Sequence, residues 1–243
     1  MTETYNIFPL GDGAVTIDLG NIISEALNNK VLAMQHWLLA HPFTGQLDIV
    51  IAYSSLTVFY DPYTVSNFYH PAGLVSGYVS EILLQAYRQS GEHTLSNEET
   101  AHIPVCYDPP FSPDLRSLAH DKQMDAEEII RLHTETTYRV YTIGFLPGFS
   151  YMATVHESLV TPRKPVPVPV AAGSIGIAGA QTGIYSLNSP GGWHIIGRTP
   201  LKQFDPGSPS LVTLRVGNIV RFYRISTTEM EQQQETVLST GNK

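Results

Sequence analysis

The chain has 243 residues, enough for one large domain or two small ones, and its 42% hydrophobic and 15% charged residues are typical of a globular protein. The net charge of −8 argues against nucleic-acid binding, and the single cysteine, Cys106, excludes an internal disulfide. Without a signal-peptide pattern or an apolar run of the roughly 18 residues that span a bilayer, we expect a cytoplasmic protein that does not bind membranes.

Residues 1–92 form the first predicted domain. The segment Gly11-Asp12-Gly13 separates two short apolar runs and predicts a hairpin. Apolar residues recur at helical spacing over 22–38 and again over 74–87, and two short apolar runs lie between these segments. The predicted strands are 5–10, 14–19, 47–53 and 56–60, and the predicted helices are 22–38 and 74–87. This order predicts an α+β domain with both helices on one face of a small sheet.

A polar, aperiodic segment at 90–102 predicts the boundary to a second domain over 100–226. A strand at 103–107, a helical turn at 114–119 and a helix that begins at Asp125 come first, with Glu128 placed to complete a capping box. From 138 to 226 we find no amphipathic helix. Short predicted strands occur instead at 138–143, 175–178, 193–197, 211–216 and 219–225. Frequent Pro and Gly between them favour a barrel or sandwich, and the polar, Gln-rich tail 227–243 predicts disorder.

The segment 172–193, AGSIGIAGAQTGIYSLNSPGGW, is rich in glycine and has no charged side chain. Its glycine spacing matches neither a Walker loop nor a dinucleotide fingerprint, and no helix follows Ser174 as a nucleophile elbow requires. The nine histidines form no metal-binding pattern, so we predict no metal site. Two interpretations stay open. The glycines either turn tight corners in a small barrel or form a ligand site of backbone and small polar groups flanked by Arg163, Lys164 and Arg198.

The segments LHTETTYRVYTIGFLPGFSYM (132–152) and AGSIGIAGAQTGIYSLNSPGGWHIIGRTP (172–200) together resemble the allophanate hydrolase subunit 1 family, which is that of the 5-oxoprolinase B subunit and includes a sporulation-kinase inhibitor. The resemblance covers roughly 52–206. It implies an α/β first domain and a cyclophilin-like, carboxyltransferase-type β barrel. It also implies hydrolysis of 5-oxoproline to glutamate, driven by ATP with Mg, in a complex with subunits A and C, of which C is also cyclophilin-like. Allophanate or another amide stays open as the substrate.

The resemblance also implies site residues. As catalytic residues it suggests His133, Arg163 and Arg198, with the two arginines on an anion and His133 as a proton-transfer or orienting group that could equally cap its own helix. The implied substrate-binding residues are Phe145, Pro147, Gly148, Lys164, Ser174, Gln181, Thr182, Gly183, Ser189, Gly191, Gly192 and Trp193. The loop 161–174, TPRKPVPVPVAAGS, departs from the family because proline and valine stand where a second arginine is expected. Either Lys164 compensates for that arginine, or the departure indicates a shifted substrate or a non-catalytic role.

An alternative function is a non-catalytic inhibitor that binds a sensor histidine kinase through the barrel. This role needs an exposed apolar surface, for which Phe145, Leu146 and Phe149 are the candidates. A prolyl isomerase would follow from the fold alone, and fold does not carry function.

Overall fold

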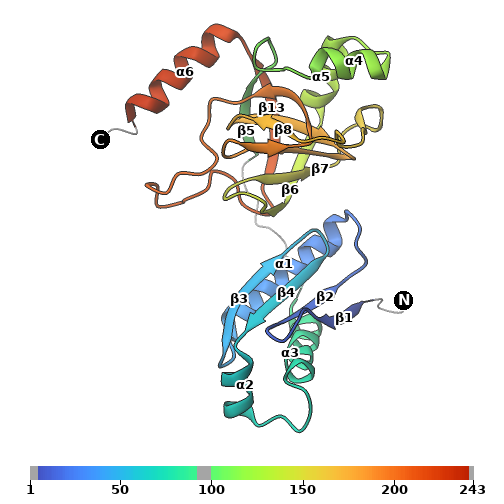
Figure 1. The fold of residues 1–243 in the computed structure, drawn as a ribbon, viewed down its shortest axis with the longest axis vertical. Helices are drawn as coiled ribbons and strands as arrows, with labels where there is room; N and C mark the ends of the chain where they lie inside the picture. Colours follow the sequence, from blue (N-terminus) through green and yellow to red (C-terminus); the bar gives the residue numbers. More distant parts are fainter. Residues whose placement is uncertain (1–4, 92–99, 241–243) are drawn as a thin grey trace. The chain divides into compact units, whose positions relative to one another are not determined.

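The computed structural model describes residues 5–91 and 100–240 and divides into two compact units, Met1–Ser96 and Asn97–Lys243 (Figure 1). The division falls inside the polar segment 90–102, most of which lies outside the described residues. Each unit buries an apolar core of its own.

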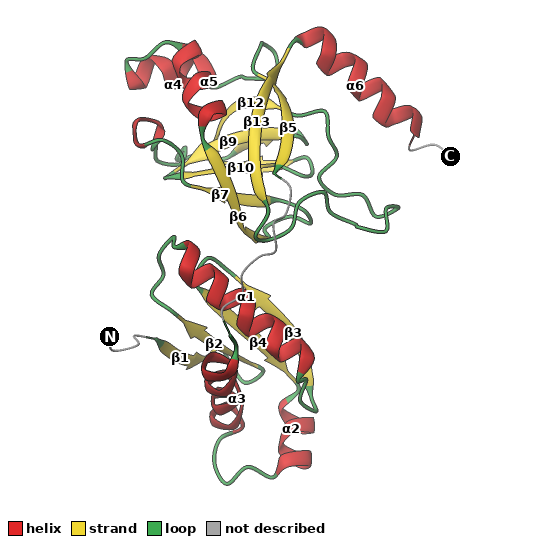
Figure 2. Cartoon of the chain, turned by 180° about the vertical axis from the view of Figure 1, so that it is seen from behind, coloured by secondary structure: helices red, strands yellow, loops and turns green. Residues whose placement is uncertain are grey.

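The first unit contains a four-stranded antiparallel sheet in the order β1-β2-β4-β3. Its elements are β1 (Asn6–Pro9), β2 (Ala14–Asp18), α1 (Glu25–Ala40), β3 (Gln46–Ile51), β4 (Ser55–Tyr60), α2 (Pro62–Tyr69) and α3 (Val75–Gln89). Figure 2 shows α1 and α3 on the same face of this sheet. Two details differ from the prediction. Ser24 caps α1, so Ile22 and Ile23 precede the helix. Helix α2 was not predicted, although Asp61 caps it and Pro62 lies in its first turn.

The second unit contains a closed seven-stranded barrel in the order β10-β7-β6-β13-β5-β12-β9. Its strands are β5 (Ala101–Cys106), β6 (Thr137–Ile143), β7 (Ser150–Ala153), β9 (Ser174–Ala178), β10 (Gln181–Ile184), β12 (His194–Arg198) and β13 (Ile219–Ile225). β5 and β13 pair in parallel, and the other pairs are antiparallel. The barrel prediction is therefore confirmed. The strand predicted at 211–216 is wrong: Leu211 has φ of 56° and the segment makes a single bridge, Phe204 to Val212.

Two helices, α4 (Leu115–Lys122) and α5 (Ala126–Glu135), lie between β5 and β6 in the chain. A separate two-stranded ribbon follows later in the sequence. The ribbon pairs β8 (Val168–Val170) with β11 (Ser189–Gly191). From 138 to 226 the described chain has no helix except the 3-10 turn Glu157–Leu159, as predicted. The capping box at Asp125 is not formed, because Glu128 bonds to Arg131 instead.

The predicted disorder of the tail is wrong over residues 227–240, which form α6 (Thr227–Thr240), whereas 241–243 lie outside the described residues. The backbone N–H and hydroxyl of Ser226 both donate to Glu229, and the Glu229 N–H donates back to Ser226, which is a complete capping box. One turn later, Met230 is fully buried against Cys106, Phe111 and Ile225. A capped and anchored first turn outweighs the polar composition that follows it.

Candidate functional site

An aromatic pocket of about 230 Å³ opens beside the β8–β11 ribbon. Phe149 is the central ring of the aromatic cluster that lines it. The Phe149 ring centroid lies 4.5 Å from that of Tyr151, 5.0 Å from that of Tyr185 and 5.5 Å from that of Trp193. The last two contacts are close to perpendicular, at 89° and 82°, which is a favoured geometry for aromatic pairs. The pocket lining consists of Phe145, Phe149, Tyr151, Arg163, Pro167, Tyr185, Pro190, Gly191, Gly192 and Trp193. Its walls therefore present ring faces and edges to a small ligand.

The sequence builds this pocket by strand alternation and one glycine. Met152 belongs to the barrel core, so its β7 neighbour Tyr151 projects to the other side. Tyr185 follows the core residue Ile184 in the same way. A Cβ on Gly191 would lie 2.2 Å from the Tyr185 hydroxyl, so only glycine lets the ribbon approach this phenol.

Arg163 supplies the positive charge of the aromatic pocket. Its guanidinium carbon lies 5.9 Å from the Trp193 ring centroid, within the range of a cation–π contact, and the side chain is exposed. Burial raises the pKa of Tyr151 and Tyr185, so both phenols stay protonated near neutral pH and can donate a hydrogen bond. The pocket thus combines one cation, two neutral donors and aromatic walls.

A second cavity, the Arg198 pocket, has a volume of about 540 Å³. Its lining is Pro169, Val170, Ala171, Asn188, Ser189, Pro190 and Arg198. Pro190, in the middle of β11, lines both cavities, so the ribbon contributes to each. Two cationic pockets therefore share one small structural element.

Arg198 faces out of the barrel because of a β-bulge. The register between β12 and β9 shifts between Ile195 and Gly197, which places Ile196 and Gly197 both against the core and turns the next residue outward. The guanidinium carbon of Arg198 lies 5.5 Å from the Phe111 ring centroid. Its Nε is buried and has no hydrogen-bond partner among the described residues, and burial lowers the pKa of Arg198. An anion in this pocket would offset the energetic cost of burying the guanidinium.

Lys164 is not placed to replace the missing arginine. Its Nζ lies 2.6 Å from Asp114 Oδ2, which also accepts a hydrogen bond from the Ile195 backbone N–H at 2.7 Å. Both side chains are largely buried. The pair ties the start of α4 to the 161–174 loop and to β12, so the expectation that Lys164 compensates is corrected: its charge is already used.

His133 is fully buried in the barrel core and lines neither pocket. Its Nδ1 lies 2.8 Å from the Tyr107 hydroxyl and its Nε2 lies 3.0 Å from Thr182 Oγ1. Because the Thr182 hydroxyl donates to the Gly176 carbonyl, Nε2–H donates to Thr182 and Nδ1 accepts from Tyr107. The ring stacks on Phe222 with centroids 4.6 Å apart, and burial lowers the pKa of His133 to about 3. A neutral, fully paired histidine holds the barrel together. The geometry supports neither proton transfer to a ligand nor capping of its helix by this ring.

This low pKa predicts a pH dependence of stability. The unfolded state binds a proton at His133 below its ordinary pKa of about 6.5, whereas the folded state does not until about pH 3, so stability falls as the pH falls between these values. Between pH 7.5 and 5.0 this one group should remove about 2 kcal/mol from the free energy of unfolding. Urea denaturation of wild type and His133→Gln at both pH values tests it. His120 is exposed, so His120→Gln serves as the control and should lose as much stability between pH 7.5 and 5.0 as the wild type. If His133→Gln also loses as much as the wild type, the prediction is contradicted.

The other predicted site residues divide into two groups. Phe145, Gly191, Gly192 and Trp193 join Arg163 at the aromatic pocket, while Ser189 joins Arg198. The remaining ones line neither pocket: Pro147, Gly148, Ser174, Gln181, Thr182 and Gly183. Ser174, Thr182, Gly148 and Gly183 are buried in packed turns and strands, as the tight-corner interpretation expects.

The exposed apolar surface predicted around residue 145 is smaller than expected. Phe145 is 63% exposed, but Phe149 is only 1% exposed and Leu146 is partly buried. Tyr151, Tyr185 and Pro167 also line the aromatic pocket and were not predicted as site residues. The alternation of Tyr151 with core residues on β7 is the signal that could have identified it.

Among residues 5–91 and 100–240, no group of three or more His, Cys, Asp or Glu side chains could hold a metal ion. Within the same residues, no helix is long and apolar enough to cross a bilayer.

Comparison with known proteins extends over almost the whole chain. The family described as "Carboxyltransferase domain, subdomain C and D" matches residues 5–214. The 5-oxoprolinase B subunit of Bacillus subtilis (strain 168) is 40% identical over 238 residues, which is 97% of this chain and 99% of that protein. The 5-oxoprolinase B subunit of Haemophilus influenzae is 34% identical over 221 residues, 89% of this chain and 96% of that protein.

Two solved structures resemble the chain in fold. The crystal structure of TTHA0988 superposes with a TM-score of 0.73 at 36% identity; the match covers 88% of this chain and 40% of that longer chain. The urea carboxylase of Kluyveromyces lactis matches with a TM-score of 0.74 at 14% identity over 94% of this chain and 22% of that chain, a likeness of fold alone. The chain therefore belongs to the carboxyltransferase-domain family that contains the 5-oxoprolinase B subunits.

Proposed function

We propose that this chain is the B subunit of a cytoplasmic, ATP-dependent 5-oxoprolinase, which converts 5-oxoproline, ATP and water to glutamate, ADP and phosphate together with subunits A and C. The observation that carries the proposal is the 40% identity to a 5-oxoprolinase B subunit along nearly the full length of both chains. The two arginine pockets beside the β8–β11 ribbon are its site, and the barrel is of the cyclophilin-like type.

The aromatic pocket suits this substrate in size and chemistry. 5-Oxoproline is a small five-membered lactam with one carboxylate, and a cavity of about 230 Å³ is below the range that drug-sized ligands occupy. In this proposal the lactam ring of 5-oxoproline packs against Trp193 and Phe149, and the carboxylate of 5-oxoproline pairs with Arg163. Tyr151 and Tyr185, both held neutral, donate to lactam or carboxylate oxygen. The Arg198 pocket then serves a second negative group of the reaction, because a preorganised cation in a partly desolvated site stabilises charge effectively.

The residues that line these pockets do not by themselves fit a magnesium nucleotide. Neither lining contains a carboxylate that could coordinate the cation, although the Arg198 pocket could hold a phosphate group. We therefore assign ATP and Mg mainly to a partner subunit.

The test is to co-express the chain with subunits A and C and to measure glutamate release from 5-oxoproline. The proposal expects release that needs ATP and that stops when this chain is omitted. A well-assembled complex that releases no glutamate would overturn it, and allophanate and other amides would be assayed next. The second candidate is a sensor-kinase inhibitor, for which Phe145, 63% exposed, is the remaining apolar contact. It is tested by adding the chain to the kinase and measuring the loss of autophosphorylation.

A further inference from the structure

We propose that the C-terminal helix α6 is a positioning element for the Arg198 pocket, and that it acts through Met230 and Phe111. The charged group in that pocket lies near an aromatic ring, Phe111, that belongs to one apolar cluster with Met230 of α6. The inference concerns how the guanidinium is held. Its relevance to catalysis depends on the proposed function.

The register of three strands brings the parts together. At one end of the barrel, Cys106 of β5 lies opposite Arg198 of β12 and opposite Ile225 of β13. Directly opposite residues on paired strands project to the same face, and Cys106 alternates with the core residues Val105 and Tyr107. These three side chains therefore project from the outer face of the barrel, where barrel packing alone leaves them uncovered.

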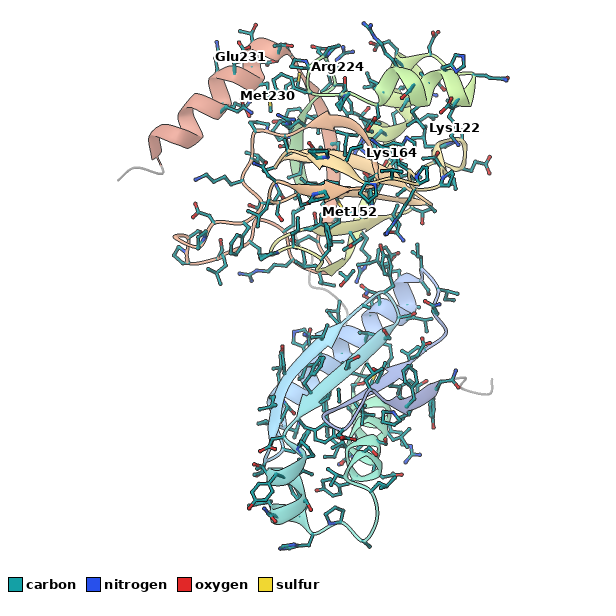
Figure 3. The ribbon with its side chains drawn as sticks, in the orientation of Figure 1. Lys122, Met152, Lys164, Arg224, Met230 and Glu231 are labelled. Atoms are coloured by element: carbon teal, nitrogen blue, oxygen red, sulfur yellow. The ribbon has the colours of Figure 1, made fainter. Side chains whose placement is uncertain are left out.

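The first turn of helix α6 packs on that face. Met230 has no exposed surface and packs with Cys106, Phe111 and Ile225 into one small apolar cluster, whereas the next residue, Glu231, is exposed (Figure 3). The first turn is further fixed by the Ser226–Glu229 capping box. Arg224 of β13 also pairs with Asp108 at 2.9 Å, just before Phe111 in the chain. Phe111 is thus held between the helix and its own anchored loop.

Arg198 is the second neighbour of Phe111 that matters for the pocket. The guanidinium carbon is 5.5 Å from the ring centroid, and its buried Nε has no partner within the described residues. A buried cation without a hydrogen-bond partner at this atom stays in place only because the groups around it fix its position. Loss of Met230 would free the Phe111 ring and let water reach the buried Nε, so Arg198 would leave the geometry that the pocket requires.

The first measurement uses the full chain alone, with 15N-labelled arginine. The Nε–Hε signal of Arg198, assigned by its loss in Arg198→Lys, should exchange slowly with water in the wild type. In Met230→Ala we expect the exchange rate to rise about tenfold or more, corresponding to a coupling of about 1.4 kcal/mol. Met230→Leu, which keeps the apolar contact, should restore slow exchange, and Glu231→Ala, on the same turn but exposed, should match wild type. Unchanged exchange in Met230→Ala would overturn the proposal.

A second measurement uses the assembled complex and a mutant cycle. Met230→Ala should lower kcat/KM about tenfold when Arg198 is present and should have no further effect in an Arg198→Ala background, because a positioning residue acts only through the group it positions. Equal effects in both backgrounds would indicate general destabilisation and contradict the inference. If Met230→Ala does not fold, Phe111→Leu takes its place in both experiments. Altered Nε–Hε exchange without any glutamate release in the wild-type complex would refute the proposed function while supporting the inference.

Discussion

Replacing Gly173 with alanine should lower the free energy of unfolding of the barrel unit by about 3 kcal/mol, a drop of about 10 °C in the melting temperature. Gly173 has φ of +81°, a left-handed conformation that costs a side-chain-bearing residue about 1–2 kcal/mol. An alanine Cβ would also lie 2.4 Å from the Thr199 carbonyl oxygen and 3.3 Å from Arg198 Cγ. The backbone has little freedom to adjust, because Gly173 donates to the Tyr185 carbonyl and accepts from the Thr199 N–H.

Gly179→Ala is the matched control for this prediction. Gly179 also has a left-handed φ, +58°, but nothing lies within 4 Å of where its Cβ would be. Its substitution should therefore cost only the conformational part, about 1 kcal/mol. Urea and thermal unfolding of both variants separate the two contributions. If Gly173→Ala is no less stable than Gly179→Ala, the close approach to Thr199 does not constrain the loop.

The barrel was predictable because its strands are short, apolar and separated by glycine and proline. Strand β13 occurs where it was predicted, and β6 differs by one residue at its start. The predicted strand at 211–216 shows where pattern reasoning fails: Leu211 and Leu214 look like part of a strand, yet a left-handed φ at Leu211 prevents a ladder. Such a backbone conformation depends on tertiary contacts that composition does not record.

The site was predictable only in part, for a related reason. Chain proximity of Arg163 and Lys164 suggested two equivalent cations, but Asp114, fifty residues away, pairs with one of them. His133 has the residue type of an acid–base catalyst, and only the fold places Tyr107 and Thr182 on its two nitrogens. The outward direction of Arg198 depends on a bulge in one strand pair. Long-range partners and register decide each of these cases, and neither is local in the sequence.

The two arginines should make separate contributions to the reaction of the assembled complex. Arg163 lines the aromatic pocket and Arg198 lines the other cavity, and Pro190 of the ribbon belongs to both linings. A charge-assisted pair with a carboxylate or phosphate contributes about 1.5–3 kcal/mol. We therefore expect Arg163→Ala and Arg198→Ala each to lower kcat/KM for 5-oxoproline by about 100-fold.

Because the two pockets share no charged partner, the effects should multiply to about 10,000-fold in the double variant. A double variant no worse than either single one would show that both arginines act on one negative group. Arg131→Ala controls for general loss of positive charge, since this exposed arginine pairs with Glu128 and Glu135 on α5, away from both pockets. If the proposed roles hold, the two variants should also differ in KM and kcat. Arg163→Ala should raise KM, because it removes the proposed partner of the substrate carboxylate. Arg198→Ala should lower kcat, because its proposed partner gains charge only during the reaction.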